Sequence, residues 1–232
     1  MKRVLVLLAV LLVLVLVGCG GTNNQGGQQG TPPSVAKTPA PIELVESGYV
    51  VTKSLYVHYA VILKNPNEDV AVDFSRFRIT ARDKDGTVLA TEDGVQSSIR
   101  PGQTYVHAFQ AFSVDEIPAT VDIEIMPAED RDWINPNKLD IPELIPLTAE
   151  GVRLGNSRDR VTGEIINSND FDIPNTVITV LFRDDSGKLI AGDTTYTGGI
   201  PKEGKIPFEI GLWGSNEFAT SNLEVYAFPS RF

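Results

Sequence analysis

The pattern of apolar and polar positions divides the chain into three parts. Residues 4–17 form an unbroken run of Val, Leu and Ala after the basic residues Lys2 and Arg3, which is the arrangement of a secretory signal peptide. Residues 20–41 are Gly, Gln, Asn, Thr and Pro with hardly an apolar side chain, so we expect a disordered tether. From residue 42 onward, apolar and polar residues alternate with a period of two over short segments, which predicts β-strands.

The alternation assigns faces to these strands. In the first well-defined strand one face is apolar, and it carries Val57, Tyr59, Val61 and Leu63. His58 and Lys64 point to the opposite face, where we expect a solvated histidine. In the second half of the chain Val161, Gly163 and Ile165 alternate with polar residues in the same way. Near Ser75 the apolar positions change phase by one residue, and one inserted residue of this kind predicts a β-bulge.

Two landmarks recur in the same order and indicate an internal duplication. Asn65-Pro66-Asn67 is followed 102 residues later by Asn167-Ser168-Asn169. Asp83 and Gly86 are followed 101 residues later by Asp184 and Gly187, and in each copy the glycine predicts a hairpin turn. About seven short strands per copy are typical of an immunoglobulin-like sandwich. The sequence therefore predicts an all-β fold with two tandem immunoglobulin-like β-sandwich domains.

The end of the apolar run contains the only cysteine of the chain. Leu16-Val17-Gly18-Cys19 resembles a bacterial lipobox, and fourteen apolar residues are fewer than the roughly 20 of a transmembrane helix. This resemblance implies that the signal is cleaved before Cys19, that Cys19 receives a diacylglyceryl thioether, and that its amino group is acylated, for example with palmitate. The alternative is an ordinary secretory cleavage that leaves Cys19 as a thiol.

These patterns set the domain boundaries. We assign residues 1–18 to a lipoprotein signal peptide, 19–41 to the lipidated Cys19 and its flexible tether, 42–127 to the first sandwich, 128–146 to an apolar connector, and 147–232 to the second sandwich. The connector contains Trp133 and five other large apolar residues. Since a free linker would be more polar, we expect it to pack against a sandwich.

The two copies resemble known families. An apolar strand, Asn-x-Asn, a second apolar strand and Asp-x-x-Gly are together similar to the FxLYD domains of bacterial lipoproteins. Copy one, with Asn65-Pro66-Asn67, also resembles the water-stress and late-embryogenesis (WHy/LEA-2) sandwich. The resemblance occurs once in each copy and together covers nearly all of residues 42–232, although the eponymous motif keeps only its aspartate, at Asp83 and Asp184. Neither family implies an enzymatic activity.

The composition argues against several functions. The formal net charge of −10 disfavours binding to nucleic acid. The sequence has no Gly-x-Ser-x-Gly motif, and its two histidines, His58 and His107, are too few for a zinc site with cysteines. Three pairs of aspartates lie in predicted loops, Asp83 with Asp85, Asp170 with Asp172, and Asp184 with Asp185. Such pairs bind calcium or simply stabilise turns.

We therefore expect no catalytic residue, no metal and no cofactor, and the ligand-binding residues stay unknown. The expected protein is anchored in the membrane through the lipid on Cys19, on the extracytoplasmic face of a bacterial membrane. There it would bind or scaffold a protein partner of the envelope. The alternatives are a protective or structural stress protein of the envelope, and an accessory carbohydrate- or calcium-binding module.

Overall fold

A computed structural model describes residues 38–96, 98–139, 145–155, 159–212 and 214–230 of the chain. The predicted signal peptide, Cys19 and most of the predicted tether lie outside these residues. The described part is all-β, as the sequence predicts.

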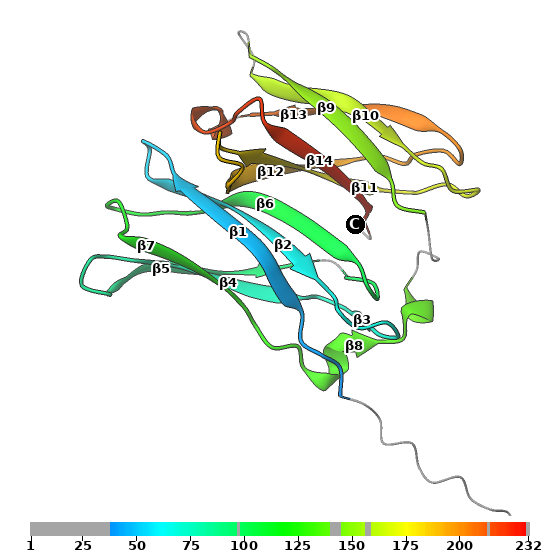
Figure 1. Cartoon of the computed structure of the whole chain (residues 1–232), viewed down its shortest axis with the longest axis horizontal. Coiled ribbons are helices and arrows are strands. Elements are labelled where there is room, and N and C mark those ends of the chain that lie inside the picture. Colours follow the sequence, from blue (N-terminus) through cyan, green and yellow to red (C-terminus); the bar gives the residue numbers. More distant parts are fainter. Residues whose placement is uncertain (1–37, 97, 140–144, 156–158, 213, 231–232) are drawn as a thin grey trace, which may run out of the picture. The chain divides into compact units, whose positions relative to one another are not determined.

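Residues 42–125 form a sandwich of two antiparallel three-stranded sheets. One sheet has the order β1-β2-β6 and the other has the order β5-β4-β7 (Figure 1). The strands are β1 (Glu43–Val51), β2 (Tyr56–Lys64), β4 (Arg76–Arg82), β5 (Val88–Val95), β6 (Thr104–Ser113) and β7 (Thr120–Ile125). This topology is that of an immunoglobulin-like sandwich whose sheets contain strands A, B and E and strands C′, C and F.

The same strand order recurs in the second half of the chain. The sheets are β9-β10-β13 and β12-β11-β14. Their strands are β9 (Thr148–Leu154), β10 (Arg160–Ile166), β11 (Thr176–Arg183), β12 (Leu189–Thr197), β13 (Lys205–Gly211) and β14 (Leu223–Pro229). The duplication predicted from the sequence is therefore a duplication of topology. Each copy has six long strands within the described residues rather than about seven, because no strand follows β7 or β14 at the edge of its sheet.

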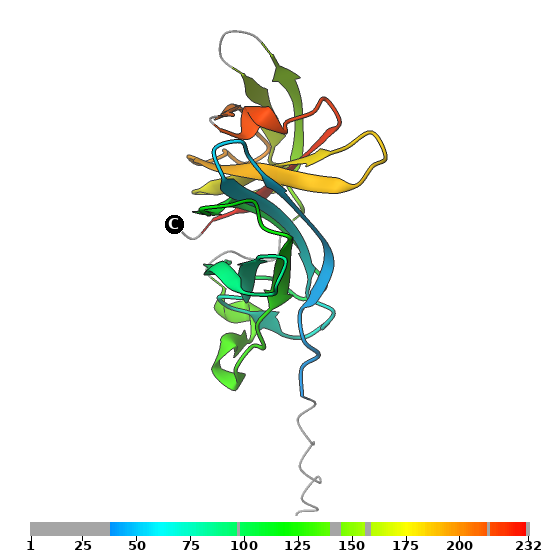
Figure 2. The same ribbon diagram turned by 90° about the vertical axis from the view of Figure 1, so that its left-hand side faces the viewer.

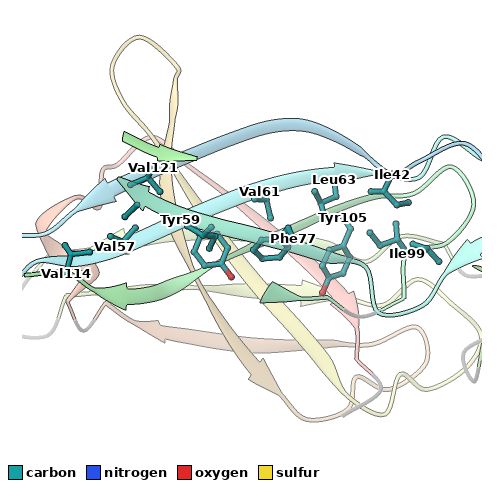
Figure 3. Packing of buried hydrophobic residues seen from close by; sticks show 13 residues of the cluster. Ile42, Val57, Tyr59, Val61, Leu63, Phe77, Ile99, Tyr105, Val114 and Val121 are labelled. Carbon is teal, nitrogen blue, oxygen red and sulfur yellow. The ribbon is translucent and has the colours of Figure 1, made fainter. Parts of the chain in front are cut away.

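The core of the first sandwich is built from the apolar positions that the alternation predicts. Val57, Val61 and Leu63 are fully buried, and the ring of Tyr59 lies 5.4 Å from that of Phe77 (Figure 3). The expected β-bulge near Ser75 is wrong. The phase changes there because the chain leaves the short strand β3 (Ala71–Val72) and enters β4 of another sheet, with Phe74 at φ 55° between them.

The connector begins by packing onto the first sandwich. Trp133, in β8 (Trp133–Ile134), pairs with Val72 of β3 and lies half-buried against the first core. The backbone N–H of Asp73 donates to the carbonyl of Asp132 at 2.7 Å. Two short 3-10 turns complete this region, η1 (Asp130–Asp132) and η2 (Pro136–Lys138). The expected packing of the connector is thus confirmed for its first half.

The two sandwiches pack face to face. The outer face of β1-β2-β6 lies against the outer face of β12-β11-β14 (Figures 1 and 2). Between them is an apolar cluster of six buried residues, Ala60, Ile62, Val106, Ala108, Leu181 and Leu189. The central strands β2 and β11 are consequently buried on both faces.

Polar contacts fix the alignment of this interface. The guanidinium of Arg183 makes two hydrogen bonds of 2.9 Å to the carboxylate of Glu46 and one of 2.7 Å to Glu224. The hydroxyls of Thr179 and Thr194 lie 2.9 Å apart in the buried centre. Glu46 lies in β1 and Arg183 lies in β11, so this ion pair joins one strand of each sandwich. The pair therefore sets the orientation of one sandwich on the other.

Glycines allow the sheets to approach this closely. A Cβ at Gly48 would lie 2.3 Å from the carbonyl oxygen of Leu189, and one at Gly192 would lie 2.7 Å from the Cβ of Ala108. Both distances are below van der Waals contact. Any larger residue at either position would push the sheets apart.

Candidate functional site

The sequence assigns one functional residue, Cys19, and this residue lies outside the described part of the chain. Within the described residues no helix is long and apolar enough to span a membrane.

The loop aspartates have a structural role in the turns. One oxygen of Asp83 accepts the backbone N–H groups of Asp85 and Thr87, each at 2.8 Å. One oxygen of Asp184 accepts those of Ser186 and Lys188 at 2.9 and 3.0 Å. These bonds hold the pKa of both carboxyls below its usual value, with the Thr87 N–H the largest cause at Asp83 and the Ser186 hydroxyl at Asp184.

The repeated Asp-x-x-Gly is thus a turn motif in both copies. Its glycines have φ of 83° and 84°, the left-handed region that favours glycine. In the third pair, Asp172 accepts the backbone N–H of Lys202 at 2.8 Å. Across the described ranges, no group of three or more His, Cys, Asp or Glu residues is placed to hold a metal ion.

In each copy, the second asparagine of Asn-x-Asn makes two hydrogen bonds to the backbone just before the first strand, and we call this arrangement a clasp. The side-chain amide of Asn67 accepts the N–H of Ala40 at 2.8 Å and donates to its carbonyl at 2.9 Å. The amide of Asn169 makes the same two bonds to Ile145, at 2.7 and 2.9 Å. In each copy the clasped residue lies three positions before the first strand. Sequence reasoning used these asparagines as landmarks and missed this role.

The first asparagine of each motif supports the second. Asn65 is fully buried and donates to the carbonyls of Val70 and Ile99 at 2.9 and 3.2 Å. Its oxygen accepts the side chain of Asn67 at 2.9 Å. The expected tether therefore ends at a fixed point on the first sandwich, because Ala40 is held by Asn67 and Asn67 is held by Asn65.

Both histidines are at least partly buried, and the expected solvated His58 is wrong. Only 4% of His58 is exposed, because the second sandwich covers its face of β2, and its ring lies 4.9 Å from that of Phe218. Burial lowers the pKa of His58, while the nearby Glu217 carboxylate acts in the opposite direction. Burial also lowers the pKa of His107 to about 4. Neither histidine is placed as a solvent-facing general base.

One seam of the first sandwich is incompletely closed. Strand β7 is the last strand of its sheet, and β1 is the last strand of the opposite sheet. On β1, Tyr49 pairs with the core residue Tyr59 and is nevertheless 42% exposed. Ile123 and Ile125 of β7 are half-buried. A strand at position G of an immunoglobulin-like sandwich would cover these side chains.

No protein-family model and no curated protein matches this chain. The loop aspartates serve turns, the histidines are packed, and the partly exposed Tyr49 lies on β1, an edge strand like β7 of the opposite sheet.

Proposed function

We propose that this protein is a non-catalytic, lipid-anchored protein of the bacterial envelope that binds or scaffolds another extracytoplasmic component. The observation that carries the proposal is Leu16-Val17-Gly18-Cys19 at the end of an apolar run, with Cys19 the only cysteine of the chain. The lipid on Cys19 would hold the protein on the extracytoplasmic face of the membrane, and residues 20–37 would form the spacer.

The clasp at Ala40 supports this arrangement. A tether transmits the position of its anchor to the folded part only if its end is attached at a defined point, and the two hydrogen bonds from Asn67 to Ala40 provide that point. The first sandwich then lies next to the spacer along the chain.

The interface between the sandwiches supports a role in binding. Six buried apolar residues and the bidentate Arg183–Glu46 pair hold the two copies in one arrangement. A surface that is held in one arrangement loses less conformational entropy on binding than a hinged one. The histidines and the loop aspartates have structural contacts, which favours binding over catalysis.

The test is fractionation of cells that produce the protein or its Cys19→Ala variant. We expect the parent in the membrane fraction, labelled by radioactive palmitate, and the variant unlabelled in the soluble extracytoplasmic fraction. Thr22→Ala, which leaves the lipobox intact, is the matched control and should behave as the parent. A Cys19→Ala variant that stays as membrane-bound as the parent would refute the anchor.

The binding part of the proposal needs a separate test. Chemical cross-linking on intact cells, followed by purification of the anchored protein, should recover one protein in stoichiometric amount. The Cys19→Ala variant should recover less of that protein, because it is no longer concentrated at the membrane. Recovery of no stoichiometric partner from the anchored parent would argue that the protein does not scaffold another component.

A further inference from the structure

We propose that the open edge of β7 binds an extended segment of a partner protein, which adds to the β5-β4-β7 sheet as a further strand. The segment would carry apolar residues at alternate positions, facing the β1–β7 seam, and Lys or Arg at the positions between them. This inference rests on the proposed function, since it names the surface and the partner chemistry of the binding protein proposed above.

The backbone of β7 offers hydrogen bonds along this edge. The N–H of Met126 donates to the carbonyl of Arg76 at the end of the ladder with β4. In an antiparallel pair, the backbone N–H and C=O groups of every second residue point to the same neighbouring strand. Those of Glu124 and Asp122 therefore point to β4, as the N–H of Met126 does. Ile123 and Ile125 then direct theirs away from the sheet, where the described residues place no strand. An added strand would pair with these groups.

The seam beside this edge leaves apolar side chains partly exposed. Tyr49 is 42% exposed, and Ile123 and Ile125 are only half-buried. An arriving strand would place every second side chain against this surface. Strand pairing and apolar burial would therefore occur together, as they do when a strand is added to a sheet edge.

The second sandwich provides the comparison, because its matching strands β9 and β14 approach each other more closely than β1 and β7 do. There Gly151 of β9 allows close packing against β14, and a Cβ on it would lie 3.1 Å from a methyl group of Val225. Beside it the guanidinium of Arg153 donates to Asp159 at 2.9 Å. By the register of the two sheets, Ser47 and Tyr49 stand in copy one where Gly151 and Arg153 stand in copy two.

Three other sheet edges carry features that disfavour the addition of a strand. Glu92 of β5 pairs with the core residue Ile79, so an acidic side chain points inward at that edge. Asp193 of β12 pairs with Val180 in the same way, and β13 contains Pro207. Inward-pointing charges and prolines are protective features of edge strands. Strand β7, Thr-Val-Asp-Ile-Glu-Ile, has neither.

Charge identifies the partner as basic. The outward positions of β7 carry the exposed carboxylates of Glu124 and of Asp122, which lies 3.5 Å from the guanidinium of Arg82. Opposite charges at facing positions of neighbouring strands stabilise their pairing, whereas like charges destabilise it. Antiparallel pairing of β7 with β7 of a second copy, centred on Ile123, would set Asp122 against Glu124. A segment with Lys or Arg at these positions is therefore favoured over a second copy of this chain.

A synthetic peptide tests the proposal directly. The probe is a fluorescein-labelled octapeptide of alternating Lys and Val, titrated with the full chain purified in detergent. Its matched control is the alternating Glu and Val peptide. We expect the control to bind about tenfold more weakly, because the two facing charge pairs each change the pairing free energy by up to about 1 kcal/mol. The Glu124→Lys variant should reduce this preference. Equal binding of both peptides would overturn the charge argument.

Two further measurements address the strand itself. Amide hydrogen exchange should show that the Lys–Val peptide protects the N–H groups of Ile123 and Ile125, while those of Asp122 and Glu124 are already protected. Ile123→Pro should abolish binding because it removes one of the outward donors, and Ile123→Thr, which keeps the donor, should retain most of it.

Thermal unfolding of both Ile123 variants checks that they are folded. Binding that survives Ile123→Pro in a folded variant would overturn the proposal. So would peptide binding that protects no amide of β7, and so would self-association of the parent chain that Ile123→Pro prevents. If the peptide does not bind but cross-linking still recovers a partner, β7 is not the binding surface. The proposed function would then still stand.

Discussion

The contact between the sandwiches can be tested by exchanging a residue between the two copies. Ala108 is fully buried in the interface and stands opposite Ala60 in the β2–β6 pair. In copy two the register sets Glu209 opposite Thr162, the residue 102 positions after Ala60. Glu209 lies on the outer face of β9-β10-β13, beside a shallow concavity. Ala108→Glu therefore introduces the residue that copy two has at the matching, uncovered position.

The expected effect is large. The carboxylate of Ala108→Glu would be enclosed between two sheets, beside Gly192 and within the apolar cluster of the interface. An uncompensated buried charge costs about 3–5 kcal/mol. The sandwiches can avoid this cost by separating, which gives up the burial of four large apolar side chains at about 1.5–3 kcal/mol each. Either outcome weakens the contact by several kcal/mol.

Urea unfolding of the full chain is the assay. We expect the parent to unfold in one transition, since its two sandwiches share a buried cluster. Ala108→Glu should lower the midpoint and separate the unfolding of the two sandwiches into two transitions. The control Glu209→Ala should stay within about 0.5 kcal/mol of the parent, as substitutions on an open surface usually do. An Ala108→Glu chain that unfolds like the parent, or a Glu209→Ala chain that loses as much stability, would refute the interface.

Three further predictions concern contacts that the sequence did not assign. Asn67→Ala should speed proteolytic cleavage around residue 40, because the clasp contributes about 1 kcal/mol per hydrogen bond; mass spectrometry of the fragments locates the cut. Arg183→Ala should lower the free energy of unfolding by about 2 kcal/mol, and a double-mutant cycle with Glu46→Ala should show coupling between the two side chains. Burial lowers the pKa of His107 to about 4 in the folded chain. As the pH falls below about 6.5, His107 is therefore protonated in unfolded chains before it is protonated in folded ones. Stability should then drop by up to about 3 kcal/mol between pH 6.5 and pH 4. His107→Phe, the residue at the matching position 208, should remove that part of the pH dependence in urea titrations.

The strands and their inward faces could be predicted because period-two alternation is a local property. It identified Val61 and Ile165 as core residues, and both are fully buried. The turns at Gly86 and Gly187 followed from the same local reasoning, because the positive φ of each turn favours glycine.

The covered face of β2 was missed although the sequence contains a signal for it. Residues 56–63 read Tyr-Val-His-Tyr-Ala-Val-Ile-Leu, and residues 177–182 read Val-Ile-Thr-Val-Leu-Phe. Such nearly continuous apolar runs are typical of strands that are buried on both faces. Alternation alone assigned His58 to water, because it considers one sandwich at a time and takes no account of a second sheet on the outer face.

The clasps and the open seam could not be predicted in this way. An asparagine in a loop is compatible with many turns, and only the fold brings Asn67 to Ala40 across 27 positions of sequence. The seam depends on which strand is absent from a sheet edge. This is a property of topology that no single segment encodes.

The comparison of the two copies separates residues that build the fold from residues that serve contacts with other surfaces. The turn aspartates Asp83 and Asp184 and the clasping asparagines Asn67 and Asn169 are the same in both copies and make the same bonds. Each copy needs these bonds for its own sandwich.

The copies differ where a surface meets something outside its own sandwich. The covered Ile62 becomes Glu164 on the uncovered face, and Tyr49 of the open seam becomes Arg153 of the more closely packed one. If the open seam of copy one had only a structural role, the residues of the more closely packed seam in copy two would serve equally well in copy one. Tyr49→Arg together with Ser47→Gly, which introduces the pair of copy two, should therefore leave the first sandwich folded and remove peptide binding at β7. Unchanged binding by this double variant would show that the β1 side of the seam takes no part in recognition.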